Sequence, residues 1–132
     1  MRLVLDTNVI ISALLFDGLP EQVLLSTLGG LHEPVLSSYI IAETTRILED
    51  KFKVQPTNIN LLQQLLSEAE VMYFQPFLNV VADEPDNRIL ETGVKGNADY
   101  LVTGDKLLLE LKEYKGIKLI SVRDCVTALD LN

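Results

Sequence analysis

The sequence predicts an α/β fold: a three-layer, doubly wound, parallel five-stranded sheet flanked by helices. Short apolar segments with strand character alternate with segments of helical spacing along the whole chain. This alternation is typical of parallel sheets built through right-handed crossovers. The first segment, Leu3-Val4-Leu5, is apolar at every position, as expected for a parallel strand that is covered on both faces. It runs directly into Asp6, so a carboxylate is expected at the end of a buried strand.

The first third of the chain predicts one strand and two helices. A strand covers Met1–Asp6, and the apolar spacing that follows predicts a helix over Asn8–Leu15, which Asp17-Gly18 ends. A second helix covers Pro20–Leu28, because proline suits the first turn of a helix. Gly29-Gly30 follows at a position where glycine commonly ends a helix.

The middle of the chain repeats this alternation. A short strand is predicted over Pro34–Ser37, and Ser37 or Ser38 offers an N-cap for a helix over Tyr39–Lys51. Pro56-Thr57 opens a further helix that runs to Ala69. The segment Val71–Phe74 is rich in residues that favour strands and predicts the third strand.

The last third predicts two more strand–helix pairs. Asp86 is expected to cap a helix that runs to Lys95, and a strand follows over Tyr100–Thr103. Asp105 begins the next helix, to Lys112, and the fifth strand covers Ile117–Ile120. Ser121 caps a last helix, which ends near Leu129.

Length and composition predict one domain over residues 1–132 with a substantial core. Apolar residues make up 48% of the chain, and the single cysteine, Cys125, excludes an internal disulfide. No signal peptide is visible, and the longest apolar run, Val9–Phe16, is far shorter than the roughly 20 residues that span a bilayer. We therefore expect a soluble cytoplasmic protein without a membrane partner.

The formal net charge of -8 allows two interpretations. Proteins that bind nucleic acids usually carry a basic face, so the charge alone argues against this class. However, a cluster of acids that holds cations makes the net charge negative without making the whole surface repel phosphates. The net charge therefore neither excludes nor supports a protein that binds nucleic acids.

Three acidic residues occupy equivalent places in the predicted fold. Asp6 ends the first strand, Asp86 lies where a loop enters a helix, and Asp105 follows the fourth strand. In a doubly wound sheet, these places lie on the same edge, where ligands bind. Glu43 is a fourth candidate, because it lies at the margin of the apolar stripe of its helix, whereas Glu49 points away from that stripe.

A cluster of carboxylates without a basic partner requires protonation or cations. Two like charges about 4 Å apart repel by roughly 4 kcal/mol at an effective dielectric constant near 20. Hard divalent ions such as Mg²⁺ prefer oxygen ligands, and they can activate water toward a phosphodiester. A Ser/His/Asp catalytic set has little support, because the only histidine, His32, lies in a glycine-rich turn, and neither a zinc cluster nor a phosphate-binding loop is visible.

Each acid also has a purely structural interpretation. An aspartate after a strand is often only a helix cap, and a glutamate on a helix is often only solvated. Asp83 and Glu84 are most simply turn residues. The functional interpretation therefore depends on the coincidence of three acids at one edge of the sheet.

Four parts of the chain, taken in order, resemble the PIN domain family: Leu3–Val9, Glu43 within a helix, Asp86–Glu91 and Ala98–Asp105. More narrowly, the chain resembles the small stand-alone prokaryotic PIN proteins of the VapC type, which are toxin components of toxin–antitoxin systems. The resemblance extends from Met1 to about Asp124. It implies a parallel five-stranded sheet with helices on both sides.

The resemblance also implies a ribonuclease that depends on Mg²⁺ or Mn²⁺ and leaves a 5′-phosphate and a 3′-hydroxyl. The positions that match the acidic quartet of the family are Asp6, Glu43, Asp86 and Asp105. Asn8 and Thr103 match polar positions that support the metal ligands, and Arg88 matches a basic position that faces phosphate. By resemblance, we expect an RNA substrate, a homodimer and an antitoxin partner.

One position departs from the family pattern. Relatives often carry a further acid two residues after the fourth one, and Leu107 stands there in this chain. The alternative hypothesis is therefore a PIN-fold interaction protein of weak or no activity. A phospho-acceptor receiver domain, which also gathers acids at a sheet edge, fits poorly, because the second and third predicted strands end in Ser37 and Phe74 instead of an aspartate.

Overall fold

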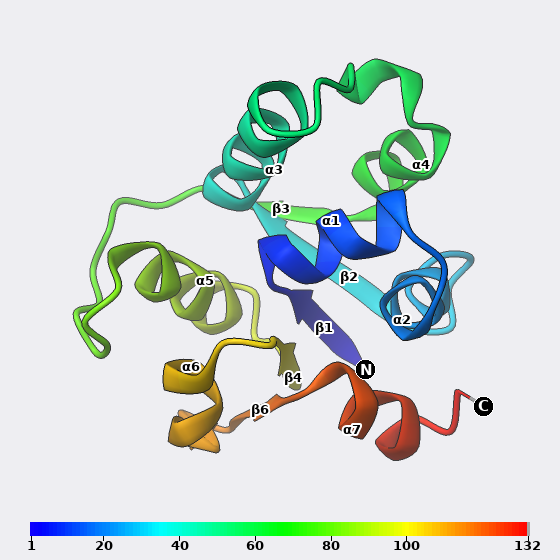
Figure 1. Cartoon of the computed structure of the whole chain (residues 1–132). Helices are drawn as coiled ribbons and strands as arrows, with labels where there is room; N and C mark the ends of the chain where they lie inside the picture. The colour runs from blue at the N-terminus through cyan, green and yellow to red at the C-terminus, as the bar shows by residue number, and fades with distance from the viewer. Residues whose placement is uncertain (132) are drawn as a thin grey trace.

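The computed structural model describes residues 1–131, so the last residue of the predicted domain, Asn132, lies outside the described part. Strands and helices alternate along most of the chain (Figure 1). The elements are, in order, β1 (Arg2–Leu5), α1 (Thr7–Leu15), α2 (Leu19–Ser26), β2 (Glu33–Ser37), α3 (Ser38–Asp50), the 3₁₀ turn η1 (Pro56–Asn58), α4 (Asn60–Glu68), β3 (Glu70–Met72), α5 (Glu84–Lys95), β4 (Tyr100–Val102), α6 (Lys106–Leu111), β5 (Glu113–Tyr114), β6 (Ile117–Ile120) and α7 (Val122–Ala128).

The strands form one sheet in the order β3-β2-β1-β4-β6-β5. Five of them are parallel, which confirms the predicted α/β fold with its parallel five-stranded sheet. A sixth strand, β5, pairs antiparallel with β6 at the edge and was not predicted, because two residues are too few to show a periodicity. Since β1 lies between β2 and β4, the strand order reverses beside β1. The carboxyl ends of β1 and β4 therefore meet at the place where doubly wound sheets bind ligands.

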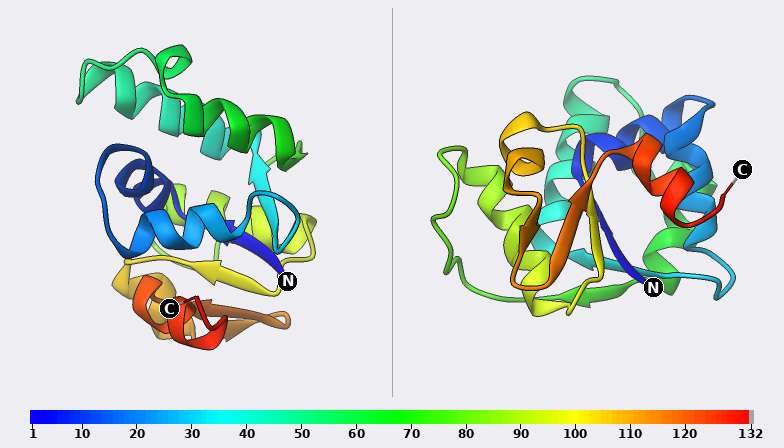
Figure 2. Two further views of the ribbon diagram at one scale, coloured as in Figure 1. Left: turned by 90° about the vertical axis from the view of Figure 1, so that its right-hand side faces the viewer. Right: turned by 90° about the horizontal axis from the view of Figure 1, so that it is seen from below.

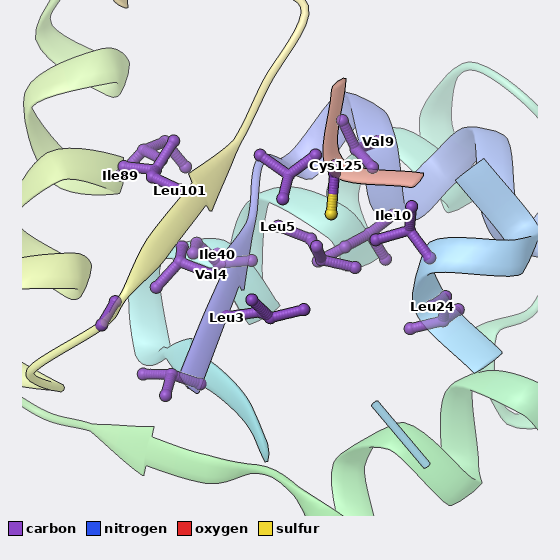
Figure 3. Close-up of a cluster of buried hydrophobic side chains, with 14 of the residues drawn as sticks. Leu3, Val4, Leu5, Val9, Ile10, Leu24, Ile40, Ile89, Leu101 and Cys125 are labelled. Carbon is purple, nitrogen blue, oxygen red and sulfur yellow. The ribbon is translucent and has the colours of Figure 1, made fainter. Parts of the chain in front are cut away.

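The core is built around β1. Leu3 and Val4 are fully buried and Leu5 is 3% exposed. They belong to one apolar cluster with residues from both sides of the sheet, among them Leu24 of α2, Ile89 of α5 and Cys125 of α7 (Figure 3). Figures 1 and 2 show α5 on one side of the strands and α2 and α7 on the other. This burial on both faces explains why the three residues of β1 that follow Arg2 are all apolar.

Most predicted helix caps are confirmed. The side chains of Ser37, Asp105 and Ser121 each accept a hydrogen bond from a backbone N–H in the first turn of the helix that follows. The predicted cap at Asp86 is wrong. The helix begins earlier because Pro85 occupies its first turn, and Asp83 is the N-cap that accepts from the Asp86 N–H at 3.4 Å.

Two other predicted elements are shorter in the structure. The helix predicted from Thr57 is interrupted at Ile59, whose extended backbone separates the turn η1 from α4. The strand predicted over Val71–Phe74 ends at Met72, where the pairing with β2 stops.

Among the described residues, no single helix has the length and apolar character to cross a membrane, and α1 and α2 meet that criterion only together, across a bend of 103°.

Candidate active site

A cavity of about 520 Å³ lies at the carboxyl end of the central strands. All four predicted acids reach it, from the ends of β1 and β4 and from the helices α3 and α5. Asn8 lines it as well, and Thr103 lies directly behind it, bonded to Asp6. The residues that line the cavity are Asp6, Asn8, Glu43, Asp83, Pro85, Asp86, Ile89, Gly104 and Asp105.

Thr103 connects two of the acids. Its hydroxyl donates to Oδ2 of Asp6 at 2.6 Å and accepts a hydrogen bond from the Asp105 N–H at 3.0 Å. Burial raises the pKa of Asp6 above its usual range, and the nearby charge of Asp105 raises it further. The Thr103 hydroxyl and the N–H groups of Asn8 and Thr7 act in the opposite direction without cancelling the rise. Thr103 thus holds the Asp6 carboxylate through its hydroxyl, and Asn8 contributes its backbone N–H, while the role of both residues in supporting metal ligands stays a prediction.

Asp86 is the acid of the cavity with a buried oxygen that no described residue hydrogen-bonds. Its side chain is buried, and its Oδ2 has no hydrogen-bond partner among the described residues. Burial, followed by the charges of Asp105 and Asp83, raises the pKa of Asp86 to about 7. A carboxyl group with this pKa carries a proton for much of the time at neutral pH unless a cation replaces that proton.

Glu43 reaches the cavity from α3. Its side chain is half-buried, and burial together with the charges of Asp6 and Asp83 raises its pKa, while Arg46 lowers it. Glu43 therefore senses the charge of the other acids. A purely solvated helix residue would not, so this arrangement favours the functional interpretation of Glu43.

The side chains fit a hard divalent cation by their chemistry. Every charged group of the cavity is a carboxylate, and none of the four acids forms an ion pair with a basic residue within residues 1–131. In the same residues, no three acidic, histidine or cysteine side chains are grouped closely enough to hold an ion directly. Mg²⁺ usually takes one or two carboxylates and keeps several waters. The Oδ2 of Asp86, which has no hydrogen-bond partner within residues 1–131, is available as one such ligand.

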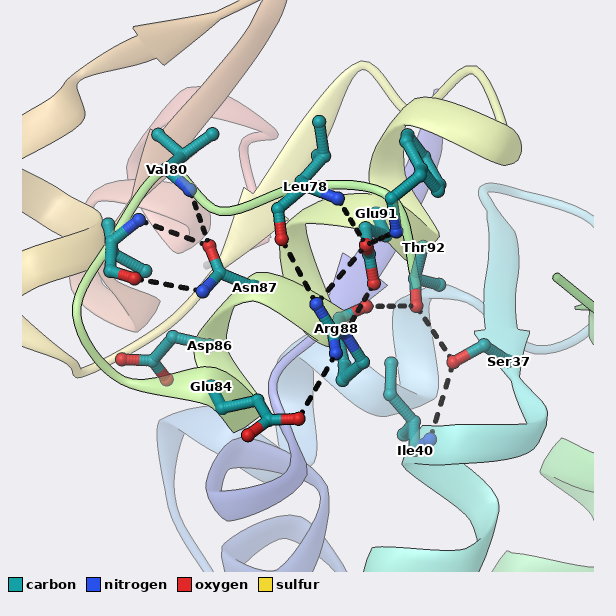
Figure 4. A network of polar contacts seen from close by, with 12 residues as sticks. Ser37, Ile40, Leu78, Val80, Glu84, Asp86, Asn87, Arg88, Glu91 and Thr92 are labelled. Atoms are coloured by element: carbon teal, nitrogen blue, oxygen red, sulfur yellow. Dashed lines mark hydrogen bonds and ion pairs between the residues drawn. The ribbon is translucent and has the colours of Figure 1, made fainter. Parts of the chain in front are cut away.

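Arg88 is engaged with its own helix and with the preceding loop. Its guanidinium pairs with Glu91, contacts Glu84 at 3.5 Å and donates to the carbonyl of Leu78 at 3.1 Å (Figure 4). The side chain is 12% exposed. The role of Arg88 in binding phosphate stays a prediction, and it requires the guanidinium to leave Glu91.

Sequence reasoning missed Asp83 and Glu91. Asp83, which was interpreted only as a turn residue, caps α5 and lines the cavity. Aspartate is a preferred N-cap residue, and Pro85 in the first turn was the available signal that the helix starts before Asp86. Glu91 is fully buried and accepts hydrogen bonds from Arg88 and from the N–H groups of Phe77 and Leu78. Its spacing of three residues from Arg88 indicated a pair, but not its burial.

Comparisons with known proteins bear on the family and on the fold of this chain. Residues 2–107 match a family described as PIN domain. One chain of VapBC2 from Rickettsia felis, in a crystal structure with a DNA fragment from the promoter, superposes with a TM-score of 0.61. The match has 20% sequence identity and covers 92% of this chain and 98% of that chain. No curated protein matches the sequence.

Proposed function

Because the chain belongs to the PIN domain family, a family of nucleases, we propose that it hydrolyses phosphodiester bonds of RNA in the acidic cavity with Mg²⁺ or Mn²⁺. The observation that carries this proposal is the convergence of four carboxylates from distant parts of the chain on one cavity. One of them, Asp86, has an unpartnered oxygen and a pKa raised to about 7. Perturbed acids in a cavity are typical of catalytic sites.

In this proposal each residue has a defined task. Asp6, Asp86 and Asp105 hold the divalent ion, directly or through water, and Thr103 keeps Asp6 in place through its hydrogen bond. Glu43 completes the site as a ligand or by orienting the attacking water. When bound, such an ion neutralises the carboxylates and activates water for attack on phosphorus. The family resemblance implies products with a 5′-phosphate and a 3′-hydroxyl.

The test removes the negative charge of one proposed metal ligand at a time. Asp6→Asn and Asp105→Asn should each lower Mn²⁺-stimulated cleavage of RNA by at least about 100-fold, because electrostatic groups of this kind contribute factors of 10²–10³. Asn caps helices about as well as Asp, so Asp105→Asn should leave the start of α6 intact. Glu49→Gln, an exposed acid on the same helix as Glu43, is the control. Full activity in both aspartate variants would overturn the proposal.

We further propose that the chain is the toxin of a type II toxin–antitoxin pair, a homodimer that acts in the cytoplasm with an antitoxin as partner. The resemblance in sequence supports this role, and so does the similarity in fold to a chain of VapBC2. Expression of the wild-type chain in a bacterial host should arrest growth, and expression of Asp105→Asn should not. Equal growth with both chains would contradict the toxin role while leaving the nuclease proposal standing.

A second candidate is a PIN-fold protein that acts by binding alone. Two observations favour it: no three acids within residues 1–131 are grouped closely enough to hold an ion directly, and the family's further acid is replaced by Leu107, which is 44% exposed. Titration calorimetry with Mn²⁺ separates the candidates. Saturable binding that Asp86→Asn weakens supports the nuclease, whereas no binding supports the interaction protein.

A further inference from the structure

An aromatic groove lies next to the acidic cavity. It has a volume of about 830 Å³ and is formed by the start of α3 and by the chain that follows β3. Four of the eight aromatic residues of the chain gather here. The residues that line the groove are Ser38, Tyr39, Ala42, Glu43, Arg46, Tyr73, Phe74 and Gln75.

The aromatic rings are held in place by one another. The rings of Tyr39 and Phe74 lie 5.4 Å apart between centroids at an interplanar angle of 42°. Phe77 meets Phe74 edge to face at 5.8 Å, and the ammonium of Lys95 lies 5.0 Å from the Phe77 ring. Tyr73, in contrast, is 78% exposed at the edge of the groove. The groove thus combines fixed rings with one exposed ring that is free to stack on a ligand.

The aromatic groove and the acidic cavity are continuous. Glu43 lines both, and a smaller hollow of about 290 Å³ between them is lined by Tyr39, Glu43, Pro85 and Ile89 among others. A chain-like ligand that lies with one unit at the acids therefore places its next units against the rings. On the same helix, Arg46 follows Glu43 by one helical turn and supplies a positive charge within the groove.

The lining indicates which ligand this groove accepts. It contains no Leu, Ile, Val or Met side chain, which are the usual receptors for the apolar anchors of a bound peptide helix. It offers flat rings, side-chain hydrogen-bonding groups and one exposed arginine instead, with the Glu43 carboxylate on the side shared with the acidic cavity. Rings that stack on unpaired bases, together with a cation for the backbone, are the usual means of binding single-stranded nucleic acid.

We propose that the aromatic groove binds unpaired nucleotides of an RNA strand next to the bond at the acidic cavity, with a base stacked on Tyr73 and a backbone phosphate at Arg46. This inference rests on the proposed nuclease function and adds a binding site for the strand beside the bond that is cleaved. Because base pairing would withhold the bases from the rings, a duplex should bind this groove poorly.

The absence of tryptophan from the sequence allows a direct test. Tyr73→Trp introduces a single reporter at the edge of the groove, and Phe16→Trp is the matched control at a 59% exposed aromatic residue that does not line it. Both are made in the Asp105→Asn background, so that the RNA is not consumed. The probes are an RNA octamer of mixed sequence, added with Mn²⁺, and a blunt duplex of the same sequence. The octamer should quench the emission of Tyr73→Trp, and neither the duplex nor the control should show this effect.

Binding constants measured by fluorescence anisotropy of a labelled octamer complete the test. Tyr73→Ala should weaken binding roughly tenfold, which is typical of the loss of one stacked base. Arg46→Ala should reduce the slope of log affinity against log salt by about 0.7, the value for one phosphate contact on a single strand, and Arg46→Lys should restore it. Arg123→Ala, at an exposed arginine of α7, is the control and should leave the slope unchanged.

The outcomes separate the two proposals. Cleavage by the wild type without quenching in Tyr73→Trp overturns the aromatic groove as an RNA site and leaves the nuclease standing. Quenching without any cleavage by the wild type supports the groove and overturns the nuclease. Emission that changes with protein concentration and not with RNA overturns the groove proposal, because it identifies this face as a contact between two copies of the chain.

Discussion

Asp86 and Glu91 lie five residues apart on α5, are both buried, and have opposite surroundings (Figure 4). Glu91 is paired with Arg88 and also accepts hydrogen bonds from two backbone N–H groups of the preceding loop. Asp86 has other carboxylates as neighbours and an oxygen without a partner within residues 1–131. A buried charge is tolerated in a structure when it is paired, whereas an unpaired one costs free energy until it takes up a proton or a cation binds beside it.

The largest effect on stability is expected from removing the carboxylate of Glu91, which is paired with Arg88. Glu91→Ala leaves the Arg88 guanidinium, whose side chain is 12% exposed, without its main partner. It also leaves two backbone N–H groups of the loop without an acceptor. The free energy of unfolding should therefore fall by about 3–5 kcal/mol. Urea denaturation followed by circular dichroism measures this loss. Glu84→Ala is the matched control, because Glu84 is 83% exposed and contacts the same Arg88. Equal losses of unfolding free energy in the two variants would show that burial does not decide how much each ion pair contributes to stability.

The unpaired carboxylate should make the metal-free protein sensitive to pH. The pKa of Asp86 is raised to about 7 from 3.8, so the folded state holds a proton that the unfolded state releases between these values. Stability is therefore fully present below about pH 4 and is lost as the pH rises through 7, with a total of about 2–4 kcal/mol. Asp6 and Glu43, whose pKa values are also raised, act in the same direction. Denaturation in EDTA at pH 5 and at pH 8 measures the difference, and greater stability at pH 8 would contradict it.

Removing the unpaired charge should stabilise the metal-free protein. At pH 8, Asp86→Asn eliminates the repulsion by Asp105 and Asp83, and the free energy of unfolding should rise by about 1–3 kcal/mol. The cap of α5 is unaffected, because Asp83 supplies it. The gain should be smaller at pH 5 and should disappear only below about pH 4, where Asp86 is protonated in both the folded and the unfolded state. Asp17→Asn, at an exposed aspartate, is the control and should change the stability by less than about 0.5 kcal/mol.

The smallest effect is expected from the ion itself. At pH 8, Mn²⁺ at about ten times its Kd should raise the melting temperature by about 4–7 °C, because binding at that concentration adds roughly 1.4 kcal/mol to the free energy of unfolding of a chain of this size. At pH 5 the increase should be smaller, since protons compete for the same carboxylates. Differential scanning fluorimetry measures both values. An equal increase in Asp86→Asn and wild type would place the ion outside the cavity.

The fold was predictable because local patterns and global topology agree. The apolar run Leu3-Val4-Leu5 predicts a strand that is buried on both faces, and strand–helix alternation predicts the parallel sheet. The antiparallel β5 escaped prediction because it consists of two residues, Glu113 and Tyr114, that are paired only through the adjacent β6. Its formation depends on a partner strand, which no local pattern encodes.

The sequence allowed us to predict which acids form the candidate site. It did not allow us to predict the hydrogen bonds that orient them. Asp6 and Asp105 follow strands, and positions at strand ends converge by topology alone. The orientation of Asp86 depends on Asp83, whose capping role releases Asp86 from the helix start and lets it face the cavity. The pairing of Glu91 with loop backbone groups depends on the path of an irregular segment, and irregular segments have no periodicity to read.

The loop between β3 and α5 is fastened by residues that do not belong to it. Glu91, Arg88 and Asn87 bind backbone groups of Phe77, Leu78, Val80 and Val81, and none of these bonds involves a loop side chain. Backbone groups are the same for almost every amino acid, so these particular hydrogen bonds do not depend on which side chains the loop carries. Exposed side chains of the loop can therefore be exchanged while the helix keeps the loop backbone in position. A grafted loop of equal length should inherit the same anchors.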